Sequence, residues 1–459
     1  AVWAAENPVL CHNAKFDLDV AVVHLGLAML PWERIHDTMF LLFLDNPHSP
    51  SLSLKPSAQR LLGMAPEEQD AILQWAISEK LLPRNAKNAG ALIYLAPGAL
   101  VGKYANGDTL RTRKLFELLY PKILARGMLP AYNRELRLLP VLLKNENEGV
   151  RVDLKLLAAD GTKYEQGQLD ADAWLRKTLK SKELNIDSDA ELADALVAAG
   201  KADEGMFLLT PKGKRSTAKD SLIGAVTDQK VLGVLQYRSK LATAYGTFIK
   251  PWLIEAQTNK GIIRPRWNQV RQSGAVGTAG ARTGRLSASR FMNTPKPYQE
   301  EEGKYQHPAY AKVPELPIVR RYLLPDRGEV WCKRDYSQQE LRVLGHFEDG
   351  VLLGEFMADF ASTQDFDVHQ LAGDILVNQY GMFNGNRKLA RTAAKTIGFG
   401  LLYGMGLGAL AERLEISVYQ AQQIRAAYLD IFPGLKDLQN DLTERGKQGL
   451  PLKTWGGRE

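Results

Sequence analysis

The sequence predicts an α+β protein built from several domains, and three observations lead to this prediction. The chain has 459 residues, which at the usual domain size corresponds to roughly three folding units. Apolar residues recur at helical spacing over 153–257 and 350–431. Residues 262–345 instead carry β-branched and aromatic runs broken by glycine, a pattern typical of strands and loops. We therefore expect helices and strands to occupy separate regions.

The first 125 residues are expected to combine an extended start with helices. The Pro- and Ser-rich segment 46–56 predicts a loop, and a helix over 133–147 is expected to stop at Gly149. Further along, the polar segment 210–219 (TPKGKRSTAK) predicts a cationic loop within the helical region. The remaining helices are expected over about 17–30, from Asp37 onward, over 58–82 and over 100–120.

Composition excludes several classes of protein. No apolar stretch approaches the roughly 20 residues of a membrane span, so no membrane partner is expected. Cys11 and Cys332 are the only cysteines, which argues against a disulfide framework. The seven histidines form no ligand spacing with them, so zinc is not supported.

The net charge of +7 is unevenly distributed. Residues 261–299 and 382–410 contain several Lys and Arg residues but no Asp or Glu. Such stretches suit a polyanion, either a nucleic-acid backbone or a nucleotide triphosphate. A solvated surface would have the same composition, so neither stretch decides the function alone.

Two segments carry the most specific chemistry. In KRDYSQQELRVLGHF (333–347) a short strand is expected to turn into a helix, leaving Asp335 at the strand end, where it could bind Mg²⁺ or simply cap the helix. In RTAAKTIGFGLLYG (391–404) two cations and two aromatic residues follow each other at intervals of four, so they share one stripe of a helix. These residues are Arg391, Lys395, Phe399 and Tyr403. Paired cations can bind a triphosphate and an aromatic ring can pack on a base or sugar, although a core helix with exposed cationic ends remains an alternative.

These segments resemble motifs A and B of the DNA polymerase I family, called family A. ARTGRLSAS (281–289) is similar to the family's TGRLS segment, which contacts the primer-template, and RRYLLPDRGEVWCKRDYS (320–337) is similar to the palm strands before motif A. The resemblance covers nearly the whole chain. It implies an RNase H-like 3′–5′ exonuclease domain followed by a right-hand polymerase. The implied domains are the exonuclease (1–125), palm entry and helical thumb (126–260), palm with motif A (261–349), helical fingers with motif B (350–434) and the start of the return to the palm (435–459).

The resemblance also implies the reaction: template-directed addition of dNTPs to a primer 3′ end by two-metal phosphoryl transfer. The implied partners are primer-template DNA and dNTPs, with accessory proteins unidentified, and the implied cofactor is Mg²⁺, two ions per active site, which Mn²⁺ can replace. Asp335 would bind both metals, and Lys395 would also donate a proton to pyrophosphate. The other implied nucleotide contacts are Arg391, Phe399, Tyr403, Gln338, His369 and Glu340, the last as the steric gate against a ribose 2′-OH. The implied DNA contacts are Arg282, Thr283, Arg285 and Asn293, with Lys212, Lys214 and Lys219 in the cationic loop.

The amino-terminal part resembles the family's exonuclease in two places. CHNAKFD (11–17) is similar to its second motif, with Asp17 as a metal ligand. KYANGD (103–108) is similar to its third motif, in which Tyr104 orients the attacking water and Asp108 binds metal. Tyr104 and Asp108 are four residues apart and so share a helical face. For Asp37 and Thr38 we prefer helix capping.

Two family motifs are not found: the Asp-x-Glu strand that opens the exonuclease and the His-Asp-Glu turn that brings the second polymerase carboxylate. We therefore expect a chain truncated at both ends and weak or inactive in both reactions. If it extends primers, Asp365 or Asp367 is the expected additional carboxylate. No 5′ nuclease domain is recognised, which favours a bacteriophage-type polymerase acting in the host cytoplasm. Phe399, where relatives can have Tyr, predicts discrimination against dideoxynucleotides.

Two other functions remain as alternatives. A single-subunit RNA polymerase shares the metal-binding Asp and the Arg, Lys and Tyr-Gly helix, but Glu340 and the TGRLS segment argue against it. A DNA-binding protein that kept the fold and lost catalysis is the second, and the presence of Asp335, Lys395 and Tyr104 argues against that one.

Overall fold

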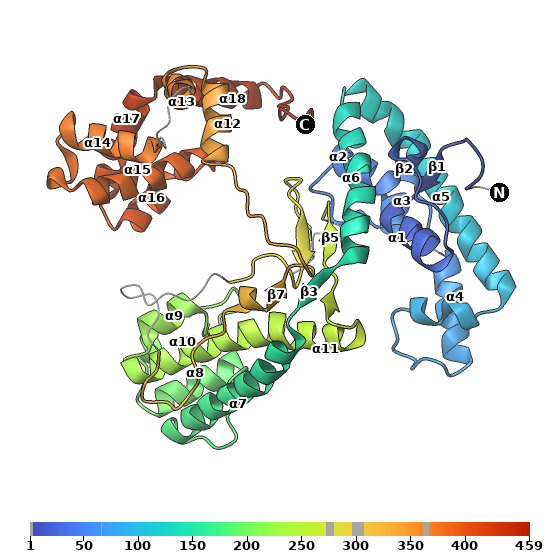
Figure 1. The fold of residues 1–459 in the computed structure, drawn as a ribbon, viewed down its shortest axis with the longest axis horizontal. Coiled ribbons are helices and arrows are strands. Elements are labelled where there is room, and N and C mark those ends of the chain that lie inside the picture. The colour runs from blue at the N-terminus through green and yellow to red at the C-terminus, as the bar shows by residue number, and fades with distance from the viewer. Residues whose placement is uncertain (1–2, 66, 272–279, 296–306, 361–366) are drawn as a thin grey trace. The chain divides into compact units, whose positions relative to one another are not determined.

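A computed structural model describes residues 3–65, 67–271, 280–295, 307–360 and 367–459. The chain divides into two compact units (Figure 1). The first unit comprises Ala1–Trp331 with Gly456–Arg458, and the second comprises Cys332–Trp455 with Glu459.

The first unit begins with two short parallel strands, β1 (Val9–Cys11) and β2 (Ile35–Asp37), paired Val9 to Ile35. Helix α1 (Ala14–Asp19) lies between them and passes into a π-helical turn, Val20–His24. The helix expected over 17–30 therefore ends early, because Gly26 adopts a φ of +64° that helical backbone excludes. Helix α2 (Thr38–Asp45) follows β2 directly.

Asp37 confirms the capping role expected for it. Its carboxylate is fully buried and accepts hydrogen bonds from the backbone N–H groups of Asn13, Ala14 and Met39 at 3.0, 2.8 and 2.8 Å. One side chain thus starts α2 and also satisfies the first N–H groups of α1. Thr38 does not cap the helix: it is the first residue of α2, and its hydroxyl donates to the carbonyl of Cys11 in β1.

Four helices complete the amino-terminal part: α3 (Leu54–Leu62), α4 (Glu67–Ser78), α5 (Gly98–Ala125) and α6 (Leu129–Glu148). Helix α3 starts inside the segment predicted as loop, because Pro56 falls in its first turn, where the missing N–H costs nothing. Helix α6 stops at Gly149 as predicted. A Cβ at Gly149 would lie 2.6 Å from Ile262 Cγ2 and 2.7 Å from the Ile263 carbonyl oxygen, so only glycine allows this close approach.

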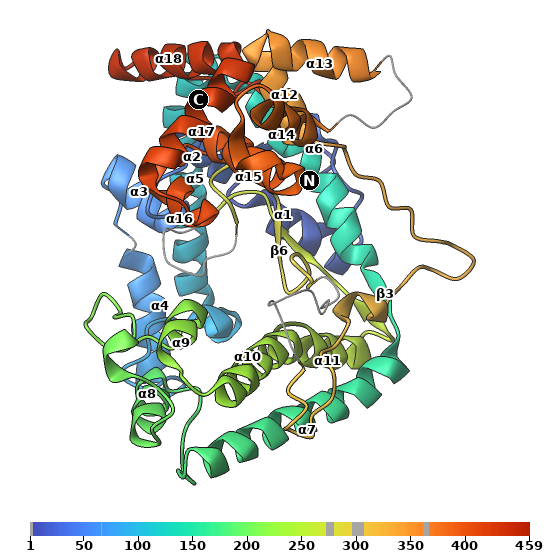
Figure 2. The same cartoon turned by 90° about the vertical axis from the view of Figure 1, so that its left-hand side faces the viewer.

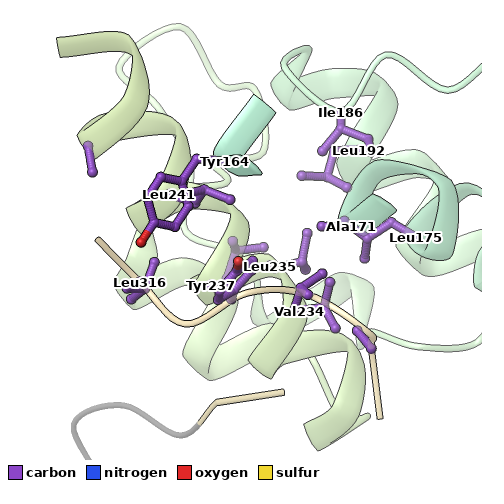
Figure 3. Packing of buried hydrophobic residues seen from close by; sticks show 14 of the residues in the cluster. Tyr164, Ala171, Leu175, Ile186, Leu192, Val234, Leu235, Tyr237, Leu241 and Leu316 are labelled. Carbon is purple, nitrogen blue, oxygen red and sulfur yellow. The ribbon is translucent and has the colours of Figure 1, made fainter. Parts of the chain in front are cut away.

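A second helical group follows strand β3 (Val150–Val152). It consists of α7 (Leu154–Thr178), α8 (Asp189–Ala198), α9 (Lys219–Ala225), α10 (Gln229–Ala244), the π-helical turn Tyr245–Ile249 and α11 (Lys250–Thr258). Figure 2 shows α7 running beside α10 and α11. Leu175 of α7, Leu192 of α8 and Leu235 of α10 meet in one apolar core, which Tyr237 and Leu316 extend (Figure 3). This group confirms the helices expected over 153–257 and the loop at 210–219.

The remaining strands of the first unit are short. Strands β4 (Ile262–Ile263), β3 and β7 (Leu323–Leu324) form an antiparallel sheet in the order β4-β3-β7. Strand β5 (Arg266–Asn268) pairs with β6 (Ser287–Ser289). The buried Glu146 carboxylate ties β5 to α6 by accepting from the Trp267 N–H at 2.6 Å, and it also accepts from Lys15 of α1 at 2.5 Å. The sheet expected over 262–345 is therefore confirmed only in part.

The second unit is helical throughout its labelled elements (Figure 1). They are α12 (Gln339–Glu348), α13 (Val351–Phe360), α14 (Val368–Asn378), α15 (Arg387–Leu402), α16 (Leu407–Leu414), α17 (Val418–Ile431) and α18 (Pro433–Lys447). A core that includes Leu341, Ala372, Ile397 and Tyr428 joins them. This confirms the helices expected over 350–431. Across the parts of the chain that the structure describes, no helix is long and apolar enough to cross a membrane.

Candidate nucleotide-binding site

Helix α15 presents the predicted stripe of cations and aromatic rings. The Asn386 side chain starts the helix by accepting from the Leu389 N–H at 3.0 Å, and Tyr403 ends it. Ala390, Ala394 and Ile397 are buried in the unit. Because these apolar residues face the core, the stripe faces outward: Lys395 and Tyr403 are exposed, and Arg391 and Phe399 are partly accessible.

Arg391 is held by a carboxylate of the neighbouring helix. Its Nε and one Nη donate to Asp367 Oδ2 at 2.9 and 2.6 Å. The other oxygen of Asp367 accepts from the backbone N–H groups of His369 and Gln370 at 2.9 and 3.2 Å and so caps α14. Asp367 thus connects the start of α14 to the stripe on α15.

His369 lies against this stripe. It is buried, and its ring centroid is 5.6 Å from that of Phe399. Burial lowers the pKa of His369, and Lys395 and Arg391 lower it further while Asp367 opposes them. The imidazole is therefore neutral at pH 7.

A Cβ at Gly398 would come within 2.8 Å of the Tyr428 hydroxyl, so the glycine lets α15 approach α17 closely.

Glu340 of α12 reaches the far end of the stripe. The Tyr403 hydroxyl donates to Glu340 Oε1 at 2.6 Å. The second unit therefore assembles Arg391, Lys395, His369, Phe399, Tyr403 and Glu340 from α12, α14 and α15, which agrees with the grouping that the sequence implied. Gln338 lies at the start of α12 in a left-handed conformation (φ 51°). The ammonium of Lys395 has no carboxylate partner among the described residues.

Asp335 lies outside this assembly. The strand expected at 333–335 was a wrong prediction: residues 330–336 form no strand, and Asp335 is exposed. A strand needs a neighbour to take its backbone hydrogen bonds, and among the described residues this segment is paired with none. Within the described ranges, no group of three His, Cys, Asp or Glu side chains could hold a metal ion. Of the two carboxylates considered as a complement to Asp335, Asp367 is engaged by Arg391, and Asp365 falls outside the described residues.

The candidate DNA contacts lie on either side of β6 and in the 210–219 loop, all in the first unit. Thr283 and Arg285 are exposed before β6, Arg282 is half-buried, and Asn293 follows β6 with a φ of +60°. Arg458 donates to the Thr283 carbonyl, and Gly284 leaves room for its guanidinium, since a Cβ there would lie 2.5 Å from Arg458 Nη1.

The cationic loop is anchored through Arg215 and Thr217, the latter by a hydrogen bond from its hydroxyl to Asp189 of α8. Arg215 bridges Asp194 at 2.5 Å and Glu204 at 3.0 Å, so its own charge is balanced. Lys212, Lys214 and Lys219 remain exposed. The loop therefore offers three lysines at the surface while its base is fixed to α8.

The candidate exonuclease residues are only partly brought together. Tyr104 and Asp108 share a face of α5, and the Lys55 ammonium lies 3.5 Å from the Tyr104 ring centroid and 3.5 Å from Asp108 Oδ1. Asp17 lies instead beside Cys11, whose thiol pKa is raised by burial and then by Asp17 and Asp37. Burial also raises the pKa of Asp17. No contact in the described structure joins Asp17 to Asp108.

Two residues were not recognised from the sequence as part of these sites. Asp367 was considered only as a metal ligand, although an Asp directly before a helical run is a capping signal. Lys55 gave no signal, because its partners lie about fifty residues away on another helix.

Comparison with known proteins first defines the class. The fold is similar to the solved "POL domain of Pol1 from M. smegmatis complex with DNA primer-template and dNTP", with a TM-score of 0.69 and 19% identity over 98% of this chain and 68% of that one. This likeness establishes a polymerase fold.

Sequence comparison then identifies the family. The chain is 26% identical to DNA polymerase DpoZ of Vibrio phage phiVC8, covering 99% of this chain and 74% of the relative. It is 25% identical to DpoZ of Acinetobacter phage SH-Ab 15497 (90% and 64%) and 28% identical to DNA polymerase I of Chloroflexus aurantiacus (99% and 44%). The sequence profile of DNA polymerase family A matches residues 159–459, and the chain belongs to this family. It spans between 44% and 74% of the length of these three relatives.

Proposed function

We propose that this protein is a template-directed DNA polymerase that binds primer-template DNA and a dNTP and adds the nucleotide to the primer 3′ end. The observation that carries the proposal is the assembly of Arg391, Lys395 and His369 beside the Glu340–Tyr403 pair in one helical unit. The family membership and the polymerase fold support it.

Five residues of the assembly have a task in this proposal. Arg391 and Lys395 are one turn apart and neutralise the triphosphate, the main requirement of phosphoryl transfer. Lys395, whose ammonium is exposed, is also placed to protonate the leaving pyrophosphate. Phe399 packs on the sugar, and Tyr403 holds Glu340 where its side chain excludes a ribose 2′-OH.

The metal part of the proposal rests on fewer residues. Asp335 would offer a carboxylate to Mg²⁺, which would supply charge neutralisation and activate the primer hydroxyl. The described residues do not complete a ligand set around Asp335, since no group of three candidate ligands is found among them. We therefore derive no step through the metal from this structure.

For primer-template DNA, the proposed contacts are the 282–285 loop with Asn293 and the three lysines of the 210–219 loop. A 3′–5′ exonuclease in residues 1–125 is proposed on the motif resemblance of Asp17, Tyr104 and Asp108. The Lys55 ammonium lies 3.5 Å from Asp108 Oδ1 and would compete with a metal ion for that oxygen. An exonuclease assay of the protein and its Asp108→Asn variant tests this part, and degradation that survives the substitution contradicts it.

The polymerase proposal is tested by binding before extension. Labelled primer-template is titrated with the protein across a salt series, and the templated dNTP is then added to the complex formed with a dideoxy-terminated primer. We expect salt-sensitive DNA binding and a stabilisation of the complex by the matched dNTP that Lys395→Ala weakens at least tenfold, the loss of one charge-assisted contact.

Two results would contradict the proposal. DNA binding without any response to dNTPs would support a DNA-binding protein without catalysis, and equal binding of ribonucleotides would support an RNA polymerase. Primer extension, if it occurs, is checked with Asp335→Ala, and extension that survives this substitution removes Asp335 from the proposed mechanism.

A further inference from the structure

Helices α14 and α15 cross so closely that the backbone of Arg391 is fixed. At the crossing, Gly373 of α14 faces the backbone of α15, and a Cβ built on it would lie 2.7 Å from Arg391 N and 2.9 Å from Arg391 Cα. The position from which the Arg391 side chain starts is therefore set by α14.

The end of the same side chain is also fixed by α14. Asp367 Oδ1 is immobilised by two backbone N–H groups of the α14 first turn, while Oδ2 accepts from Arg391 Nε and one Nη. Burial alone would raise the pKa of Asp367, but its hydrogen bonds from Arg391 and from the first turn of α14 outweigh burial, so the pKa lies below its ordinary value. The carboxylate stays ionised, and the hydrogen bonds to it are charge-assisted.

The pairing leaves part of the guanidinium available. Arg391 is 42% exposed, and its Nη1 engages no other group within the described residues. Lys395 follows one turn later on the exposed stripe. A mobile arginine loses rotamer freedom when it binds a ligand, whereas an arginine already held in one orientation loses less.

We propose that Asp367 is a positioning residue for nucleotide binding: it orients the Arg391 guanidinium, before any ligand arrives, so that the remaining donors meet the triphosphate together with Lys395. The inference rests on the proposed function, because it assumes that the stripe on α15 binds a dNTP. In this inference Asp367 raises the affinity for the dNTP by acting through Arg391, and it does not contact the reacting atoms.

An inhibitory role for Asp367 is also physically reasonable, and experiment can distinguish it from positioning. A carboxylate beside Arg391 also cancels part of the positive charge that attracts a triphosphate, so a purely inhibitory Asp367 would weaken binding. Asp367→Asn removes the charge and keeps a side chain that caps helices well. Asp367→Glu keeps the charge and moves the carboxylate by one methylene. If Asp367 positions Arg391, both variants bind the dNTP more weakly. If Asp367 only cancels charge, Asp367→Asn binds the dNTP more tightly and Asp367→Glu binds it as the unaltered protein does.

The chain offers a matched control. Asp374 of the same helix pairs with Arg387 of α15 at 3.7 Å, so Asp374→Asn breaks an ion pair between the same two helices without touching Arg391. Each variant, with the full chain bound to a dideoxy-terminated primer whose template base is T, is titrated with dATP in Mg²⁺, and dTTP serves as the mismatched nucleotide. Amide hydrogen exchange of α14 confirms that each variant is folded.

We expect about three- to tenfold weaker dATP binding for Asp367→Asn and Asp367→Glu, the factor associated with immobilising one long side chain, and unchanged binding for Asp374→Asn. In an Arg391→Ala background, Asp367→Asn should add no further loss. Unchanged or tighter binding by Asp367→Asn, or a loss that persists without Arg391, overturns the inference while leaving the proposed function intact. If the unaltered chain binds no dATP, both are overturned.

Discussion

The contact between Gly373 and Arg391 makes one substitution quantitatively predictable. Gly373→Ala places a methyl group 2.7 Å from a backbone nitrogen, well inside the ~3.5–4.0 Å of ordinary heavy-atom contacts. The neighbour is main chain and cannot rotate away, so α14 and α15 must separate. Overpacking of this kind costs about 1–3 kcal/mol.

A second glycine isolates that cost from helix propensity. Gly354 lies within α13 of the same unit, and a Cβ there would meet nothing within 4 Å. Alanine at an open helical position is stabilising by about 1 kcal/mol relative to glycine. Both substitutions receive this gain, so the difference between the two variants equals the overpacking cost, about 1–3 kcal/mol in favour of Gly354→Ala.

Native-state amide hydrogen exchange is the suitable assay, because it reports opening free energies helix by helix and needs no global two-state transition. We expect faster exchange in α14 and α15 for Gly373→Ala, and slower exchange in α13 for Gly354→Ala. The same Gly373→Ala protein should bind dATP more weakly, since Arg391 moves relative to His369. If Gly373→Ala slows exchange as Gly354→Ala does, the close crossing described here is wrong.

Three further predictions concern stability and selectivity. Arg238→Met leaves the Asp172 carboxylate buried without its partner at 2.8 Å and should cost about 3–5 kcal/mol in urea unfolding, most of which Asp172→Leu in the same chain should restore. Burial lowers the pKa of His12 to about 4, so the unfolded chain takes up the proton first and stability should fall by up to about 3 kcal/mol as the pH drops from 6.5 to 4. His12→Gln should remove this loss of stability at low pH. Burial raises the pKa of Asp37 to about 6, which makes stability rise as the pH falls, but equally in the unaltered protein and in the variant. If the two proteins show the same dependence of unfolding free energy on pH, His12 is not the group responsible. Phe399→Tyr adds a hydroxyl beside the sugar. In competition titrations it should improve dideoxynucleotide binding about two- to tenfold relative to dNTP binding. If Phe399 does not contact the sugar, the ratio of the two affinities is the same in the variant and the unaltered protein.

The helices and the stripe on α15 were predictable from the sequence. The interval of four between Arg391, Lys395, Phe399 and Tyr403 places them on one face through helix geometry alone. Gly149 marks a helix end and Asp37 a helix start by rules that involve only neighbouring residues. The motif resemblance identified the family, which the match over residues 159–459 confirms.

The strands were predicted less well for a related reason. A strand is stabilised by a partner that can lie far away in the sequence, as Arg151 pairs with Ile262 and with Leu324. Residues 333–335 have a suitable composition but no pairing strand within the described part of the chain, and they form no strand. Local composition therefore overestimated the extent of the sheet and wrongly placed Asp335 at the end of a strand.

By itself, then, the sequence determined the order of helices, the outward stripe of cations and aromatics, and the family. Only the tertiary structure decided which carboxylates meet these residues. Asp367 reaches Arg391 across 24 positions, and Glu340 reaches Tyr403 across 63. The physical reason is that a helix determines the spacing of its own side chains, whereas contacts between helices depend on packing, here on the missing side chain of Gly373.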